Sequence, residues 1–286
     1  MSKQFYSWRA KHFVQVNDYT WRPKSGKIEK LIRDELSRHA VAIKLEDAAK
    51  GIPEPLYSDS PFQWDDTHFQ RIVDFIATSR VNLPGGKVRA AGSEGAFLAI
   101  LRQLSSGLIY AGEGDSTSFM LSGSRMDALE NLIDSTQGPV LVAAFYKAEV
   151  EAMLRRFGGR ARAFVGSTAP AERTKLISDW NADRLPVLIA APGAMGHGIN
   201  LQHGSSRTIV WFTHSFDWAQ RAQFNARLVR SGQTKTISII NLVGDCGIDR
   251  AVLASLDAKK VGERAILDAL DIRHRFDAPE LSHAAT

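Results

Sequence analysis

The sequence holds one cysteine, Cys246, and no apolar run that approaches the roughly 18 to 20 residues needed to span a bilayer. One thiol cannot form an internal disulfide, and without a companion cysteine it gives no metal-binding spacing. We therefore interpret Cys246 as a packing residue and expect no metal site in the chain. The first residues, MSKQFYSWRAKHF, lack the apolar segment of a signal peptide. These absences predict no membrane partner and a cytoplasmic location.

A P-loop, G-x-x-x-x-G-K-[ST], is also missing, and with it the loop that grips nucleotide phosphates. The pairs Gly26-Lys27 and Gly86-Lys87 are followed by Ile28 and Val88, where the motif needs a hydroxyl. Asp245 follows an apolar run, but no P-loop precedes it, so we interpret it as a loop residue and not as a Walker B aspartate. The sequence therefore predicts no self-sufficient nucleotide site.

A net charge of +5 suits a polyanionic partner such as nucleic acid. Mildly basic proteins are common, however, so the charge alone does not identify the partner.

From Arg125 onward, short β-branched runs alternate with helical patterns, as they do in a parallel sheet with crossover helices. Strands are predicted at residues 139–145, 161–166, 186–191, 207–212 and 236–243. Five strands with intervening helices indicate an α/β lobe with a RecA-like parallel sheet and flanking helices.

The region before this lobe has a different pattern. Amphipathic helical segments at residues 27–38 and 68–79 are separated by prolines and by the pair Gly85-Gly86. We interpret this region as helical or irregular, without a second sheet. The predicted organisation is a helical connector over residues 1–120, the lobe with closing helices over 121–272, and a tail over 273–286.

The segment QFNARLVRSGQ, residues 223–233, places Arg227 and Arg230 three residues apart on a predicted helix, so that both project from one face. Two planar guanidinium groups suit a polyphosphate, because each donates paired hydrogen bonds to non-bridging oxygens. The alternative is two solvated arginines, since such pairs are common on exposed helices.

Two further loops follow predicted strands. In APGAMGHGINLQHG, residues 191–204, the glycines allow backbone amides to approach phosphate, although a plain tight turn is the alternative. In FVGSTAPAERTKLISDWN, residues 164–181, a Gly-Ser-Thr loop precedes a helix whose N-terminus suits a nucleic-acid phosphate. The alternative there is ordinary helix capping by Ser167 or Thr168.

Taken together, these segments resemble the C-terminal helicase lobe of Swi/Snf-like, superfamily-two ATPases, in the short form of bacteriophages and prophages. PVLVAAFYKAEVEAML is similar to motif IV, LIAAPGAMGHGINLQHG to motif V and QFNARLVRSGQ to motif VI. FVGSTAPAERTKLISDWN resembles the segment that touches the tracking strand. The flanks also resemble the inter-lobe and connector regions of this family, so that the likeness extends to about residue 270.

The resemblance implies roles for particular residues. Arg227 and Arg230 would reach ATP bound on an opposite lobe, with Arg230 as the arginine finger. The residues implied at the nucleotide cleft are Gly196, Gly198, Asn200 and Gln223. Those implied at the DNA backbone are Gly166, Ser167, Arg173, Pro192 and Gly193. Many relatives carry serine where Ala194 stands, so one hydroxyl contact to DNA is absent here or supplied elsewhere.

Without Walker motifs, the chain is expected to work as half a motor that binds ATP and Mg²⁺ only when a complementary first lobe completes it. That lobe would be a separate chain or missing sequence, and the setting a bacterial or phage-infected cell. The expected partner is the DNA backbone, without sequence preference. The alternative is a non-catalytic DNA- or protein-binding module that competes with an intact helicase.

Overall fold

The computed structural model describes residues 3–16, 21–39, 51–196 and 198–257. The chain divides into two compact units, Met1–Lys50 and Gly51–Thr286. The first unit contains α1 (Lys3–His12), a short antiparallel pair β1 (Phe13–Gln15) and β2 (Trp21–Pro23), and α2 (Gly26–His39). The helix predicted at residues 27–38 is therefore confirmed. The predicted domain boundary at residue 120 stays a prediction, and that at 272, with the tail, lies outside the described residues.

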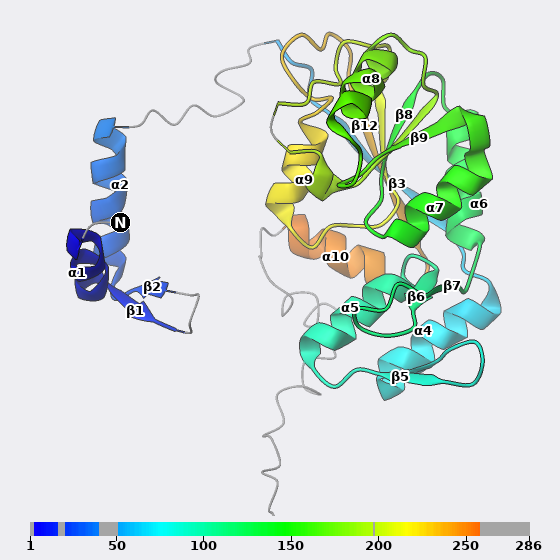
Figure 1. Ribbon diagram of the computed structural model, residues 1–286, viewed down its shortest axis with the longest axis horizontal. Coiled ribbons are helices and arrows are strands. Elements are labelled where there is room, and N and C mark those ends of the chain that lie inside the picture. The colour runs from blue at the N-terminus through cyan, green and yellow to red at the C-terminus, as the bar shows by residue number, and fades with distance from the viewer. Residues whose placement is uncertain (1–2, 17–20, 40–50, 197, 258–286) are drawn as a thin grey trace, which may run out of the picture. The chain divides into compact units, whose positions relative to one another are not determined.

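A six-stranded parallel sheet forms the centre of the second unit (Figure 1). In spatial order its strands are β3 (Leu56–Phe62), β12 (Ser238–Gly244), β11 (Thr208–Trp211), β8 (Val140–Ala143), β10 (Val187–Ala190) and β9 (Ala161–Phe164). Every residue of β8, β10 and β11 is buried, which explains why these strands appear in the sequence as continuous apolar runs. The predicted RecA-like parallel sheet is confirmed.

The sixth strand, β3, corrects the prediction of five strands, because it comes from the region interpreted as helical or irregular. Its sequence, LYSDSPF, mixes polar and apolar residues and is largely exposed, so it carries no apolar run. All seven residues pair with β12, from Leu56 opposite Ser238 to Phe62 opposite Gly244. Pro61 is tolerated because β3 is an edge strand.

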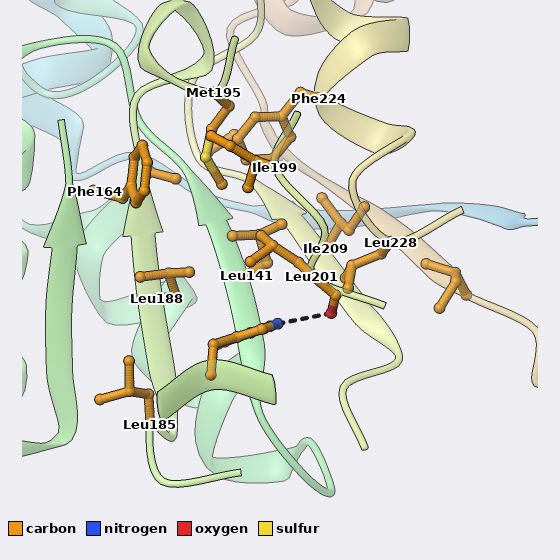
Figure 2. Close-up of a cluster of buried hydrophobic side chains, with 14 of the residues drawn as sticks. Leu141, Phe164, Leu185, Leu188, Met195, Ile199, Leu201, Ile209, Phe224 and Leu228 are labelled. Atoms are coloured by element: carbon orange, nitrogen blue, oxygen red, sulfur yellow. Dashed lines mark hydrogen bonds between the residues drawn. The ribbon is translucent and has the colours of Figure 1, made fainter. Parts of the chain in front are cut away.

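Helices cover both faces of the sheet, and the alternation of side chains along each strand separates two cores. Val140 and Val142 of β8 pack with the helices α6 (Ser124–Ser135) and α7 (Lys147–Phe157). Leu141 and Ala143 face the opposite core, which includes residues of α8 (Pro170–Asn181) and α9 (Trp218–Asn225). Figure 2 shows this second core, where Met195, Ile199 and Phe224 lie together. Within it, Trp180 is buried and its Nε1 donates to the Leu201 carbonyl at 3.0 Å.

A third core belongs to the connector region. It joins α4 (Asp66–Thr78) and α5 (Glu94–Leu104) with two short hairpins and with α10 (Ile248–Asp257). The hairpins are β4 (Arg80–Asn82) with β5 (Val88–Ala90), and β6 (Leu108–Tyr110) with β7 (Ser118–Met120). The pair Gly85-Gly86 makes the first hairpin's turn, with φ angles of 86° and 81° that favour glycine. Among the described helices, none is long and apolar enough to cross a membrane.

Candidate functional site

The carboxyl ends of the parallel strands meet at one edge of the sheet, where open α/β sheets bind their ligands. The loops after β8, β9, β10 and β11 all lie at this edge. The loops after β9 and β10 are adjacent, and the amide of Ala191 donates to the Phe164 carbonyl at 3.0 Å. Two of the three segments singled out in the sequence are therefore neighbours.

The loop after β9 exposes Gly166 and Ser167. Arg173 donates from Nε to the Thr168 carbonyl and from Nη2 to the Gly166 carbonyl, both at 2.8 Å. Its guanidinium also lies 5.3 Å from the centre of the Phe164 ring. Arg173 thus shapes this loop by holding its carbonyl groups.

Helix capping does not account for the Gly-Ser-Thr sequence of this loop. The residue at the N-cap of α8 is Ala169, and no side chain caps the helix. Thr168 instead accepts a hydrogen bond at Oγ1 from the amide of Val165, at 2.9 Å. Ser167 is exposed and makes no capping bond, so the alternative interpretation of this segment as an ordinary cap is wrong.

The loop after β10 begins with a 3₁₀ turn, Pro192–Ala194, in which Pro192 is buried and Gly193 exposed. A Cβ atom on Gly193 would lie 3.8 Å from Nε2 of Gln220, so this turn packs beside the first turns of α9. Further along, Gly196 and Gly198 are exposed. Gly198 has a φ angle of 88°, which L side chains rarely adopt.

The arginine pair follows a helix instead of lying on one. α9 ends at Asn225, and the amides of Arg227 and Leu228 bond to carbonyls three residues back, as in a tight turn. The helix stops there because the backbone has another partner: the Arg227 carbonyl accepts the Leu201 amide at 3.2 Å. The prediction that both arginines project from one helical face is therefore wrong.

The two arginines have different surroundings. Arg227 is buried, and its Nη1 donates to the Ile199 carbonyl at 3.3 Å. Burial, and then the nearby charge of Arg230, lower the pKa of Arg227 from its ordinary value. Arg230 is only partly buried. Arg227 therefore braces the loop, whereas Arg230 keeps part of its surface accessible.

These contacts join the segments that resemble motifs V and VI. The Arg227 side chain donates to the Ile199 carbonyl, the Leu201 amide donates to the Arg227 carbonyl, and Nε2 of Gln202 donates to the Ser231 carbonyl at 3.5 Å. Asn200, between Ile199 and Leu201, and Gln223, on α9, are both exposed. The structure thus brings the arginine pair next to the glycine loop that follows β10.

Sequence reasoning missed a group of buried charges at the other end of this edge. Arg125 pairs with Asp249 and donates to the Phe212 carbonyl. Asp249 also accepts the Gly244 amide at 2.8 Å, and Nε2 of His214 lies 3.7 Å from its carboxylate. Arg125 and Asp249 are far apart in sequence, so no local spacing signals the pair.

Glu149 was also missed. It is fully buried in the first turn of α7, and its carboxylate accepts the amides of Phe145 and Tyr146 at 2.7 and 3.0 Å. The hydroxyl of Thr213 donates to the other carboxylate oxygen at 2.6 Å. Burial raises the pKa of Glu149 above its ordinary value, while these hydrogen bonds oppose the shift. A glutamate three residues into a predicted helix was the available signal for such a capping bond.

Comparison with known proteins agrees with this geometry. Residues 124–232 match the family described as the helicase conserved C-terminal domain. Protein p41 of Acyrthosiphon pisum secondary endosymbiont phage 1 is 28% identical over 174 residues, which cover 59% of this chain and 36% of that protein. This chain therefore spans only part of the length of that relative.

Two solved structures share the fold. The C-terminal part of the Fun30 ATPase domain has a TM-score of 0.60 at 17% identity, covering 78% of this chain and 97% of that one. The SWI2/SNF2 ATPase core of Sulfolobus solfataricus has a TM-score of 0.50 at 14% identity, covering 89% of this chain and 55% of that one. Residues 124–232 therefore form a RecA-like lobe that is similar to the helicase conserved C-terminal domain.

Proposed function

We propose that this chain is the second lobe of a Swi/Snf-type DNA-dependent ATPase, a helicase or translocase, and that it supplies Arg230 to ATP held by a complementary first lobe. The observation that carries the proposal is the junction of Arg227 with Ile199 and Leu201. Two solvated arginines on an exposed helix would need no such junction. It holds the arginine pair beside the loop of Gly196 and Gly198.

On the nucleotide side, Arg230 is the arginine finger and Arg227 supports it. A guanidinium placed against the γ-phosphate offsets charge that develops during phosphoryl transfer. Four exposed residues on the two joined segments are proposed to line the cleft: Gly196, Gly198, Asn200 and Gln223. Mg²⁺ is proposed to bind with ATP at the Walker motifs of the complementary lobe.

On the nucleic-acid side, the loops after β9 and β10 are proposed to follow the DNA backbone. The Sulfolobus solfataricus neighbour was solved in complex with double-stranded DNA, which supports this assignment. Gly166, Ser167 and Gly193 are exposed, and their loops open into helical turns whose amides suit phosphate oxygens. Pro192 and Arg173 contribute by fixing the two loops. Contacts of this kind carry no sequence preference.

The decisive experiment reconstitutes the full chain with a first lobe that carries Walker A and B motifs, and compares Arg230→Ala with wild type. Loss of an arginine finger lowers ATP turnover by about 10³-fold to 10⁵-fold. Arg155→Ala serves as the matched control, because Arg155 is exposed on α7, away from this edge. That control should leave turnover unchanged. The chain without a first lobe should show no ATPase activity.

If Arg230→Ala hydrolyses ATP normally in a demonstrably assembled pair, the arginine-finger assignment is wrong. The chain would then be a DNA- or protein-binding module. Motor-like ATP turnover by the chain alone would contradict the need for a complementary lobe.

A further inference from the structure

Two loops at the carboxyl edge share one buried carboxylate. Glu149 accepts the amides of Phe145 and Tyr146, in the loop after β8, and the hydroxyl of Thr213, in the loop after β11. Burying a carboxylate costs free energy unless its oxygens accept hydrogen bonds, and Glu149 is fully buried. Short hydrogen bonds to an ionised acceptor are stronger than those between neutral groups. Glu149 therefore ties the two loops together.

Arg102 of α5 holds the same two loops a second time. Its guanidinium carbon lies 3.9 Å from the ring centre of Phe145 and 4.9 Å from that of Phe216. Its Nε and Nη2 atoms are buried and have no hydrogen-bond partner within the described part of the chain. The aromatic rings are therefore its main contacts, a placement that suits the flat guanidinium and not an ammonium group.

The second of these loops runs directly into the arginine-bearing segment. Asp217, the residue after Phe216, caps α9 by accepting the amides of Ala219 and Gln220 at 2.8 and 3.2 Å. α9 has eight residues, so it is only about 12 Å long. The position of the first turn of α9 therefore determines the positions of the residues that follow Asn225.

The far end of α9 is fixed as well. Trp211 donates from Nε1 to the side-chain oxygen of Asn225 at 3.0 Å, and both residues are buried. Hydrogen bonds thus fix both ends of this short helix. A shift of its first turn passes to Arg227 and Arg230, because eight helical residues leave little room to absorb it.

We propose that Arg102, Glu149 and Thr213 form an edge clamp that positions α9 and, through it, Arg230. This inference rests on the proposed function, since it assigns the clamp to the arginine finger of that reaction. The three residues are positioning residues: they contact the loops and not the nucleotide. The clamp also links Arg230 to Tyr146, in the loop after β8 at the same carboxyl edge.

Thr213→Val tests the clamp with the least disturbance of packing, because it removes the hydroxyl and keeps the shape. Glu149→Ala would leave three buried hydrogen-bond donors without an acceptor, and the variant could fail to fold for that reason. In the reconstituted pair, Thr213→Val should lower kcat by about 10-fold to 100-fold, the cost typical of a reacting group misplaced by an ångström. The KM for ATP should not change, because an arginine finger acts on the transition state.

Two variants control for structural damage. Thr213→Ser keeps the hydroxyl and should restore kcat to within a few-fold of wild type. Thr136→Val removes a hydroxyl that donates to the Leu132 carbonyl at 2.6 Å, ahead of β8 and away from the clamp. It should leave kcat unchanged. Equal losses in Thr213→Val and Thr136→Val would overturn the proposal.

Combination with Arg230→Ala separates the clamp from other effects. If the clamp acts only through Arg230, then Thr213→Val and Arg102→Met have no further effect on kcat in the Arg230→Ala background. Multiplied effects would show that the clamp residues act elsewhere. If Arg230→Ala alone loses nothing, the proposed function has failed, and the positional claim is decided without ATP.

That measurement is fluorine NMR of the full chain labelled with fluorotryptophan. Trp218 is the first residue of α9, and its resonance is assigned by its loss in Trp218→Phe. Thr213→Val and Arg102→Met should each shift or broaden the Trp218 resonance, whereas Thr136→Val should not. An unmoved resonance in both clamp variants would refute the clamp, whatever the ATPase result.

Discussion

The two halves of the carboxyl edge treat polar groups in opposite ways. Near β11 and β12, charges are drawn inside: Arg125, His214 and Asp249 are each at most 2% exposed and contact one another or backbone carbonyls. Near β9 and β10, Gly166, Gly193 and other residues of the two loops are exposed. The same edge therefore contains a buried ionic half and a solvent-facing half.

This difference separates residues that stabilise the fold from residues that are available to contact a ligand. A buried ion pair contributes little net stability compared with apolar packing, but removing one partner is costly, so it makes its surroundings intolerant of change. Substitutions in exposed glycine loops change the stability of the folded chain little, and the amides of these loops remain available to a phosphate. We infer that the β11–β12 half holds the lobe together and that the β9–β10 half serves a ligand. Substitutions should therefore affect stability in one half and binding in the other.

The largest expected effect is on the buried half. Asp249→Ala leaves the guanidinium of Arg125 buried without its carboxylate, which should reduce the free energy of unfolding by about 3–5 kcal/mol. Urea denaturation followed by circular dichroism measures this change. Asp134→Ala is the matched control, because it breaks an exposed pair with Arg160 and should cost about 1 kcal/mol or less. Similar losses in the two variants would erase the contrast between buried and exposed charges.

A smaller difference in the free energy of unfolding is expected between the variants of the two arginines, Arg227 and Arg230. Arg227→Ala removes a buried side chain and its hydrogen bond to the Ile199 carbonyl, so it should lower the free energy of unfolding by about 1–3 kcal/mol. Arg230→Ala should change it by no more than about 0.5 kcal/mol. Thermal unfolding of both variants beside wild type gives the comparison. Equal destabilisation would place Arg230 in the buried half.

The strands of the sheet were predictable from the sequence where burial on both faces requires a continuous apolar run. Strands such as β8 and β10 are buried on both faces, so their apolar runs stand out against the polar helix faces between them. β3 left no such pattern, because its side chains are largely exposed and its pairing with β12 stabilises it. Edge strands of this kind depend on a partner distant in sequence.

The candidate site was predictable in chemistry but not in geometry. The residue types and spacing of Arg227 and Arg230 pointed to phosphate, and their proximity to the loop after β10 followed from the resemblance. The extent of α9 was mispredicted because the backbone of Arg227 bonds to Leu201, a tertiary contact that overrides helix propensity. Arg125 and Asp249 escaped notice for the same reason.

Acidification should weaken the buried half specifically. Burial, then the charges of Arg221 and Arg125, hold the pKa of His214 well below its ordinary value near 6.5. The unfolded chain therefore binds a proton at a higher pH than the folded chain does. The contribution of neutral His214 is complete above about pH 6.5 and is lost as the pH falls below it, by up to about 1.4 kcal/mol per pH unit.

Replacement of His214 isolates this contribution. His214→Gln should flatten the pH dependence of the free energy of unfolding below pH 6.5 relative to wild type. Glu149 and Asp249 have the opposite sign, because burial raises the pKa of each and its contribution is lost as the pH rises, but both are present in both proteins. His203→Gln, at an exposed position, should leave the wild-type slope. Identical slopes for wild type and His214→Gln would count against a neutral buried histidine.

The smallest effect on folding is expected in the solvent-facing half, at Ser167. Ser167→Ala should change the free energy of unfolding by no more than about 0.5 kcal/mol, because the side chain is exposed and caps no helix. Affinity for duplex DNA, measured by fluorescence anisotropy, should fall by about 0.5–1.5 kcal/mol, the net worth of one hydrogen bond. The salt dependence of binding should not change, because no charge is removed.

Thr168→Ala provides the contrast within the same loop. Its buried hydroxyl accepts the Val165 amide, so this substitution should cost about 1 kcal/mol of stability by leaving that donor without its partner. Ser167→Ala should therefore lower affinity while preserving stability, and Thr168→Ala should lower stability first. If Ser167→Ala instead destabilises the fold and leaves DNA affinity intact, Ser167 is a structural residue. The assignment of the β9–β10 half to ligand contact then loses its most exposed hydroxyl.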